Sequence, residues 1–147
     1  MFESWWGHQI MKFFNCLKCG DSHKIDNRSK NKYCSIRCQI DYQYDQIIAE
    51  WKITHDARSG TGTAPWLKRY LFEKQGGSCN CCKNTEWLGK PINLELEHKD
   101  GNGVNDHEDN LELLCPNCHS YTPTYKGRNR GNGRHTRRER YKEGKSF

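Results

Sequence analysis

No stretch of the 147-residue sequence is apolar over the length needed to span a lipid bilayer, which argues against a membrane protein. The N-terminus also lacks the charged segment and apolar stretch of a secretory signal, so we expect a cytoplasmic location. Apolar residues are scarce, at 33% of the chain against 29% charged residues, and the mean hydropathy is −1.09. A short chain with so little apolar surface cannot build a large hydrophobic core, so it needs another source of stability.

Cysteine is the residue type that the sequence has in excess. Eight of the nine cysteines form four pairs with CxxC or CxxxC spacing. In a chain without a secretory signal, this spacing favours metal-bound thiolates over disulfides. We therefore expect structural zinc ions to supply the stability that the small core does not.

The first two pairs predict a zinc-finger module over residues 1–38. Its ligands are Cys16, Cys19, Cys34 and Cys38, with a polar segment of fourteen residues between the pairs. Two such pairs complete a tetrahedral zinc site. His23 is an alternative ligand, and no function is drawn from residues 1–15.

The other two pairs predict a second structural zinc site. Its ligands are Cys79, Cys82, Cys115 and Cys118, and thirty-two residues separate the pairs. Cys81 is the odd cysteine and could replace Cys79 or Cys82, but the two-residue spacing favours the latter two.

The pattern of the remaining residues predicts a small α+β fold. Apolar residues at spacings of three and four predict a helix over residues 39–58, followed by a linker at 59–63. A second helix is expected over residues 64–75, with proline near its start and two glycines at its end. Alternation predicts a strand over 92–98, and a returning strand follows at 111–114. Pro116 is suited to the first turn of a last helix.

Ionisable residues gather around this expected hairpin. Glu97 and His98 are adjacent, so in a regular strand they face opposite sides and share a site only where the strand ends or bends. His119 directly follows the last cysteine, and the zinc would tie its helix against the hairpin. His107 is a rival for ligand or base. Three loop aspartates could join a metal site, but a solvated acidic loop is the preferred interpretation (Asp100, Asp106 and Asp109).

Glu97-His98, Asn110-Leu111 and Cys115-Pro-Asn-Cys118-His119 occur in an order that resembles the HNH endonuclease motif, in its zinc-knuckle-bearing form common among phage-encoded and homing-type nucleases. The resemblance covers about residues 64–135. It implies a ββα-metal nuclease unit over residues 64–125. The zinc-finger module at 1–38, the helix and linker at 39–63 and a C-terminal arm at 126–147 complete the expected organisation.

The resemblance also implies roles for single residues. His98 matches the general base that activates water, and Asn110 matches the asparagine that orients the histidine or its loop. Glu97 and His119 match the ligands of a catalytic divalent ion, Mg²⁺ or another. Two departures are visible: the family often has Asp where Glu97 stands, and Gly where Lys83 follows the first knuckle.

Positive charge is concentrated at the C-terminus. Residues 121–147 hold nine Lys/Arg and two Asp/Glu, whereas residues 1–120 carry a net charge of −1. Such an arm is suited to phosphates of double-stranded DNA, although a solvated tail without a partner is an alternative. The candidate contacts are Arg128, Arg130, Arg134, Arg137, Arg138 and Arg140.

The sequence thus predicts a metal-dependent DNA endonuclease with two structural zinc ions. A non-catalytic zinc-containing DNA-binding module is the alternative function. Whether the enzyme nicks one strand or cuts both stays open. Cutting both strands with one active site would require a dimer or two visits.

Overall fold

The computed structural model describes residues 11–25, 32–57, 64–129 and 144. Contacts between residues divide the chain into two units, Met1–Ile47 and Ile48–Phe147. The linker predicted at 59–63 lies outside the described residues. None of the helices among the described residues is both long enough and apolar enough to cross a membrane.

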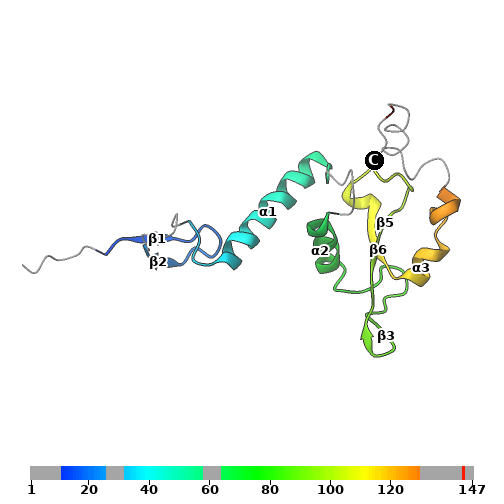
Figure 1. Ribbon diagram of the computed structural model, residues 1–147, viewed down its shortest axis with the longest axis horizontal. Helices are drawn as coiled ribbons and strands as arrows, with labels where there is room; N and C mark the ends of the chain where they lie inside the picture. The colour runs from blue at the N-terminus through cyan, green and yellow to red at the C-terminus, as the bar shows by residue number, and fades with distance from the viewer. Residues whose placement is uncertain (1–10, 26–31, 58–63, 130–143, 145–147) are drawn as a thin grey trace, which may run out of the picture. The chain divides into compact units, whose positions relative to one another are not determined.

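The first unit contains a small hairpin and the beginning of a long helix. Strands β1 (Phe13–Asn15) and β2 (Ser22–Lys24) pair in antiparallel register, and the first CxxC turn lies between them (Figure 1). Helix α1 (Ile36–Thr54) begins three residues before the predicted helix, because the Ser35 Oγ accepts a hydrogen bond from the Cys38 N–H and caps its first turn. The last cysteine of the first quartet therefore lies on a helix.

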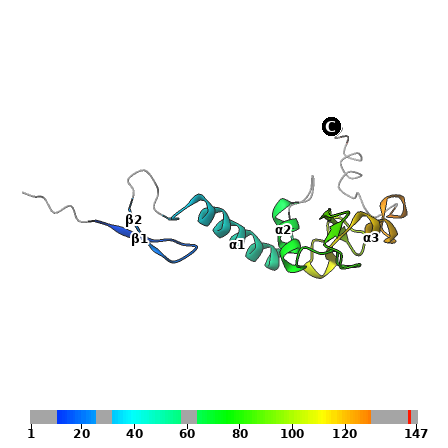
Figure 2. The same ribbon diagram turned by 90° about the horizontal axis from the view of Figure 1, so that it is seen from below.

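The second unit is built around a two-stranded hairpin with a helix on either side. Strands β5 (Glu95–His98) and β6 (Leu111–Leu114) pair antiparallel, with His98 opposite Leu111. Helix α2 (Pro65–Lys74) packs against β6, and helix α3 (Pro116–Tyr121) packs against both strands. Figure 1 shows the β5–β6 hairpin between α2 and α3. Figure 2, the view turned by 90°, also shows α2 and α3 apart from each other.

The core of this unit joins the hairpin to α2 and the end of α1. Trp51 is 1% exposed and meets the rings of Trp66 and Tyr70 edge-on, with centroids 5.8 and 5.4 Å away. The remaining fully or nearly fully buried apolar side chains come mainly from α2 and the hairpin (Leu67, Leu71, Leu94, Leu111, Leu113 and Leu114). Burial of these side chains removes apolar surface from water and holds the hairpin in place.

The end of α2 is fixed to the edge of the hairpin. The backbone turns through Gly76 and Gly77, whose φ angles are 64° and 70°, and the Gly77 N–H bonds to the Phe72 carbonyl at 2.9 Å. The Gln75 side chain accepts from the Leu113 N–H and donates to the Leu113 carbonyl, at 2.8 and 3.0 Å. Its amide thus satisfies both backbone groups at the edge of β6.

The strand predicted over 92–98 is shorter than expected. Regular pairing covers only Glu95–His98, while Lys90–Pro91 forms strand β4, which pairs with β3 (Glu86–Trp87). This small second hairpin was not predicted. Two 3₁₀ turns complete the described structure, η1 (Glu108–Asn110) before β6 and η2 (Lys126–Asn129) after α3.

Candidate active site and metal centres

Both cysteine quartets predicted from the sequence are assembled in the structure. All nine cysteines are free, and within each quartet the four sulfur atoms lie within 4.8 Å of one another. Sulfur–sulfur distances are 3.8 Å for Cys19–Cys34 and 3.9 Å for Cys82–Cys115. A tetrahedron with Zn–S bonds of about 2.3 Å has edges of about 3.8 Å, so the donor sets fit zinc. The two quartets can each hold a metal ion.

The acidity of the sulfurs differs within a quartet. Burial opposes ionisation of Cys79, but backbone N–H donors from Cys115, Cys82 and Cys81 outweigh it and lower its pKa to about 6. Backbone donors, with that of Cys19 the strongest, likewise lower the pKa of Cys16 to about 6. Burial and the neighbouring sulfurs raise the pKa of the Cys118 thiol. The close packing of four sulfurs favours a bound cation, because metal ligation requires thiolates and the cation offsets their negative charge.

The two alternative ligands lie outside these quartets. Cys81 is exposed and is not among the four clustered sulfurs. His23 forms a separate group with Cys19 and Asp21, and its buried Nε2 has no hydrogen-bond partner among the described residues. The quartet geometry therefore favours the all-cysteine sets.

His119 lies between two carboxylates of β5. Its Nδ1 is 2.6 Å from the Glu95 Oε2, and its Nε2 is 2.8 Å from the Glu97 Oε2. Glu95 and Glu97 are two residues apart on one strand, so they share a face. Thr124 donates a hydrogen bond to the other oxygen of Glu97, whose side chain is only 8% exposed. The structure thus brings Glu97 and His119 together, as the sequence predicts.

His98 is the last residue of β5 and has a different partner. Its Nε2 lies 3.0 Å from the Oδ1 of Asp106, whose side chain is 5% exposed. The interpretation of Asp106 as part of a solvated acidic loop is therefore wrong. The chain turns directly after His98, because the Gly101 N–H bonds to the His98 carbonyl at 2.8 Å. The strand thus ends at His98, and the regular alternation of β5 does not continue past this residue.

Asn110 holds the loop between the strands together. Its Nδ2 donates to the Asp100 Oδ1 and to the Asn105 carbonyl, at 2.9 and 2.8 Å, and its Oδ1 accepts from the Asp100 N–H. Burial opposes ionisation of Asp100, but hydrogen bonds from Asn105, Asn102 and Asn110 lower its pKa. Asn110 therefore contacts the loop that carries Asp106 and has no bond to His98 itself.

The other ionisable loop residues have structural contacts. The His107 Nδ1 caps η1 by accepting from the Asp109 N–H at 3.4 Å. Asp109 itself is 90% exposed, in agreement with a solvated loop position. Glu108 accepts from Tyr70 at 2.6 Å and pairs with Lys74 at 2.5 Å, which fixes the turn to α2.

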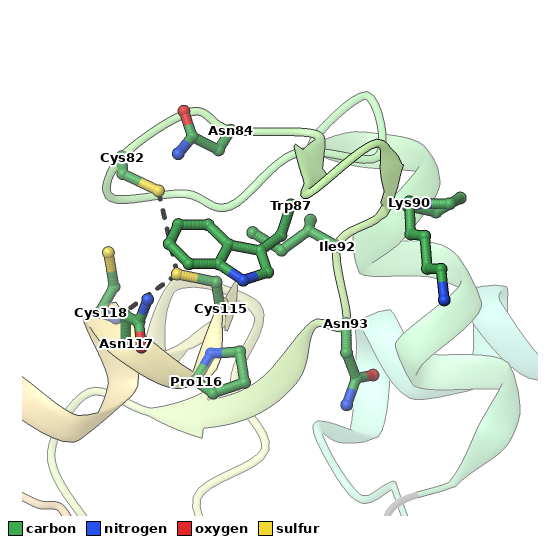
Figure 3. Close-up of a pocket in the computed structure, with 11 residues that line it drawn as sticks. Cys82, Asn84, Trp87, Lys90, Ile92, Asn93, Cys115, Pro116, Asn117 and Cys118 are labelled. Carbon is green, nitrogen blue, oxygen red and sulfur yellow. Dashed lines mark hydrogen bonds between the residues drawn. The ribbon is translucent and has the colours of Figure 1, made fainter.

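A cavity of about 560 Å³ is lined in part by three cysteines of the second quartet. Figure 3 shows Cys82, Cys115 and Cys118 on one side of it and Lys90 and Asn93 on the other. None of the four predicted catalytic residues lines it. We therefore build the candidate active site on the hairpin and α3 and not on this cavity.

Of the predicted arginine contacts, only Arg128 is described. Its guanidinium donates to the Thr122 carbonyl at 2.7 Å. The other five lie outside the described residues (Arg130, Arg134, Arg137, Arg138 and Arg140).

Sequence reasoning missed Glu95 and Thr124, which contact the candidate site, and it preferred a solvated loop position for Asp106. Glu95 was recognisable, because the two-residue period of a strand places it on the face of Glu97. Asp106 and Thr124 reach the site through loop folding. No pattern in the sequence distinguishes them from other loop residues.

The comparisons agree with the motif. Over 53 residues the chain is 62% identical to the H-N-H endonuclease F-TflIV of Escherichia phage T5, a stretch that covers 36% of this chain and 23% of the relative. The chain thus matches about a quarter of the length of this curated relative. No family model and no solved structure matches the chain. The resemblance to the HNH endonuclease family is confirmed for the matched part of the chain.

Proposed function

We propose that this protein is a metal-dependent DNA endonuclease that hydrolyses phosphodiester bonds. The observation that carries the proposal is the placement of His119 against Glu97 at the end of a strand that finishes in His98. These are the residues that match the motif, and the similar phage protein is named as an endonuclease.

Glu97 and His119 are proposed to hold the catalytic divalent ion, Mg²⁺ or another. The contact of His119 with Glu95 is suited to donation from Nδ1–H, since metal-binding histidines commonly donate their second N–H to a carboxylate. The lone pair of Nε2 then faces a carboxylate oxygen of Glu97 at 2.8 Å. A lone pair that faces a carboxylate oxygen at this distance is unfavourable unless a cation lies between them, and a divalent ion would fill this role. When bound, such an ion stabilises charge on the phosphate and the departing oxygen.

His98 is proposed to act as the general base. It removes a proton from the attacking water, and an imidazole is suited to this role near neutral pH. Asn110 supports the base indirectly, because its hydrogen bonds fix the loop from Asp100 to Asn105.

The two cysteine quartets are proposed to bind structural zinc. Four thiolates leave no open coordination position, so these ions would hold the shape and take no part in hydrolysis. The second quartet ties the first turn of α3 to the knuckle at Cys79–Cys82, because the Cys115 N–H donates to the Cys79 sulfur at 3.2 Å. This arrangement positions His119 and supports the ββα-metal interpretation of β5, β6 and α3.

Double-stranded DNA is the proposed substrate. The basic C-terminal arm would neutralise phosphates around the cut, and such contacts set register without reading the sequence. Because these contacts between the arm and phosphates would be electrostatic, raised salt is expected to weaken DNA binding.

Plasmid cleavage in the presence of Mg²⁺ or Mn²⁺ tests the function. We expect the zinc-loaded wild-type protein to convert supercoiled DNA, and EDTA to stop the reaction. His98→Ala is expected to reduce the rate by about 10²–10⁴-fold, because it removes the general base. Its DNA affinity, measured by fluorescence anisotropy, is expected to stay unchanged.

His107→Ala is the matched control, since His107 is a half-exposed histidine in the loop that follows β5, where it caps η1. It is expected to retain cleavage. Absence of cleavage with every divalent ion, together with tight and salt-sensitive DNA binding, would contradict the proposal and favour the non-catalytic DNA-binding module.

A further inference from the structure

Asp106 is a buried carboxylate beside the proposed general base. We propose that Asp106 is a positioning residue that holds His98 in the tautomer with hydrogen on Nε2, so that the lone pair of Nδ1 is available to the attacking water. This inference rests on the proposed function, because it gives His98 its orientation in that same site.

With Asp106 ionised, its contact with His98 selects one tautomer of the imidazole. An ionised carboxylate can only accept hydrogen bonds, so an Nε2 atom 3.0 Å from the Asp106 Oδ1 must carry hydrogen. Neutral imidazole has one N–H, which leaves Nδ1 as the basic atom. Among the described residues, none forms a hydrogen bond with the Nδ1 of His98. The side chain is 17% exposed, so the ring is not sealed within the protein.

Asp106 is itself held in place by the end of α1. Its second carboxylate oxygen accepts from the Ala57 N–H at 3.1 Å, and its carbonyl accepts from the indole N–H of Trp51 at 2.9 Å. Trp51 and Ala57 are 1% and 3% exposed. Each carboxylate oxygen therefore has an assigned donor, and the side chain cannot rotate without losing one of them.

Substitution by asparagine distinguishes control of the His98 tautomer from a purely structural role of Asp106 in holding its loop against Trp51 and Ala57. Asp106→Asn keeps the shape but provides one acceptor and one donor in place of two acceptors. The buried Ala57 N–H requires the acceptor, which turns the amide NH₂ toward Nε2 of His98. His98 must then carry its hydrogen on Nδ1, where it cannot take a proton from water. In a serine protease, the same Asp-to-Asn exchange beside a histidine lowers kcat by about 10⁴-fold with the geometry intact.

The experiment compares wild-type protein with Asp106→Asn, both full-length and zinc-loaded. We expect kcat for duplex cleavage with Mg²⁺ to fall by about 10²–10⁴-fold, with the DNA dissociation constant and KM unchanged. Long-range ¹H–¹⁵N spectra, recorded at a pH above which the imidazole signals no longer change, report the tautomer of His98. We expect hydrogen on Nε2 in the wild type and on Nδ1 in the variant. Asp109→Asn, at an exposed loop position, is the control and is expected to change neither.

The spectra keep the two proposals separate. If the wild type does not cleave DNA, the proposed function fails, while the tautomer comparison still decides the role of Asp106. A wild-type His98 with hydrogen on Nδ1 would overturn the inference without reference to any variant. This measurement therefore remains decisive even if Asp106→Asn does not fold. A folded Asp106→Asn protein with kcat within twofold of the wild type would overturn it equally.

Discussion

Gly101 is the residue on which the turn after His98 depends. Its φ angle is 74°, and an added Cβ would lie 2.5 Å from the Asn129 Oδ1 and 2.8 Å from the Thr124 Cγ2. Thr124 is also the residue that donates to Glu97. We expect Gly101→Ala to lower the free energy of unfolding by about 1–3 kcal/mol and to reduce cleavage, because the strain is relieved by displacing Thr124. Urea unfolding of the zinc-loaded protein measures the first effect.

Gly127→Ala is the control for this substitution. No atom lies within 4 Å of a Cβ at Gly127, and its backbone is outside the left-handed region. It is expected to be neutral or stabilising by up to about 1 kcal/mol, since alanine restricts the unfolded chain. Equal destabilisation by the two variants would show that the packing around Gly101 is not what limits substitution.

At this scale the sequence identifies the residues of the motif but not their surroundings. The adjacency of Glu97 and His98 and the position of His119 after Cys118 are local, so they can be read directly. The carboxylate that bonds to His98 belongs to a loop of similar aspartates. Tertiary contacts, among them those with Trp51 and Ala57, distinguish Asp106 from the other two loop aspartates.

The two cysteine knuckles are the elements whose geometry is repeated. In each, the residue after the second cysteine donates its N–H to the carbonyl of the first, from Gly20 to Cys16 and from Lys83 to Cys79, both at 2.9 Å. Gly20 has a φ of 79° and Lys83 a φ of 62°. The lysine therefore occupies a left-handed position at which glycine is the unstrained residue.

We expect Lys83→Gly to stabilise the zinc-loaded protein by about 1 kcal/mol, because it removes the clash of Cβ with the following carbonyl. Within the described part of the chain, the Lys83 side chain forms one exposed hydrogen bond, to Asn80. Thermal unfolding at a fixed zinc concentration measures the change. Gly20→Ala is the reciprocal variant, with nothing within 4 Å of the added Cβ, and is expected to destabilise the first unit. A loss of stability in Lys83→Gly would show that the side chain contributes more than the backbone strain costs.

Element prediction succeeds where a local signal is strong. The returning strand is found at Leu111–Leu114, and α3 begins at Pro116, as proline at a first helical turn predicts. The β3–β4 hairpin was missed because its two-residue loop, Leu88-Gly89, is not a typical turn sequence. Leu88 adopts a φ of 52° and is 86% exposed, so neither propensity nor burial indicates a strand there.

At the scale of the whole molecule, each unit contains one of the two cysteine quartets. The first quartet lies entirely within Met1–Ile47 and the second within Ile48–Phe147. The first unit buries little apolar surface, since Met11, Phe13, Leu17 and Ile36 are all more than half exposed. We expect a unit with so small a core to need a metal ion at its quartet in order to fold.

This division predicts that the two metal sites can be removed separately. Cys34→Ser is expected to lower the zinc content from two ions per chain to one and to unfold the first unit. Cys115→Ser is expected to remove the other ion, release α3 from the knuckle and abolish cleavage, because His119 is no longer held at Glu97. Metal analysis gives the stoichiometry, and amide hydrogen exchange shows which unit has lost protection.

In Cys34→Ser, the amides of β5 and β6 are expected to keep wild-type protection, since their hydrogen bonds and packing lie in the second unit. Loss of protection in both units after either substitution would contradict independent metal centres, and a wild-type content of one zinc would contradict two.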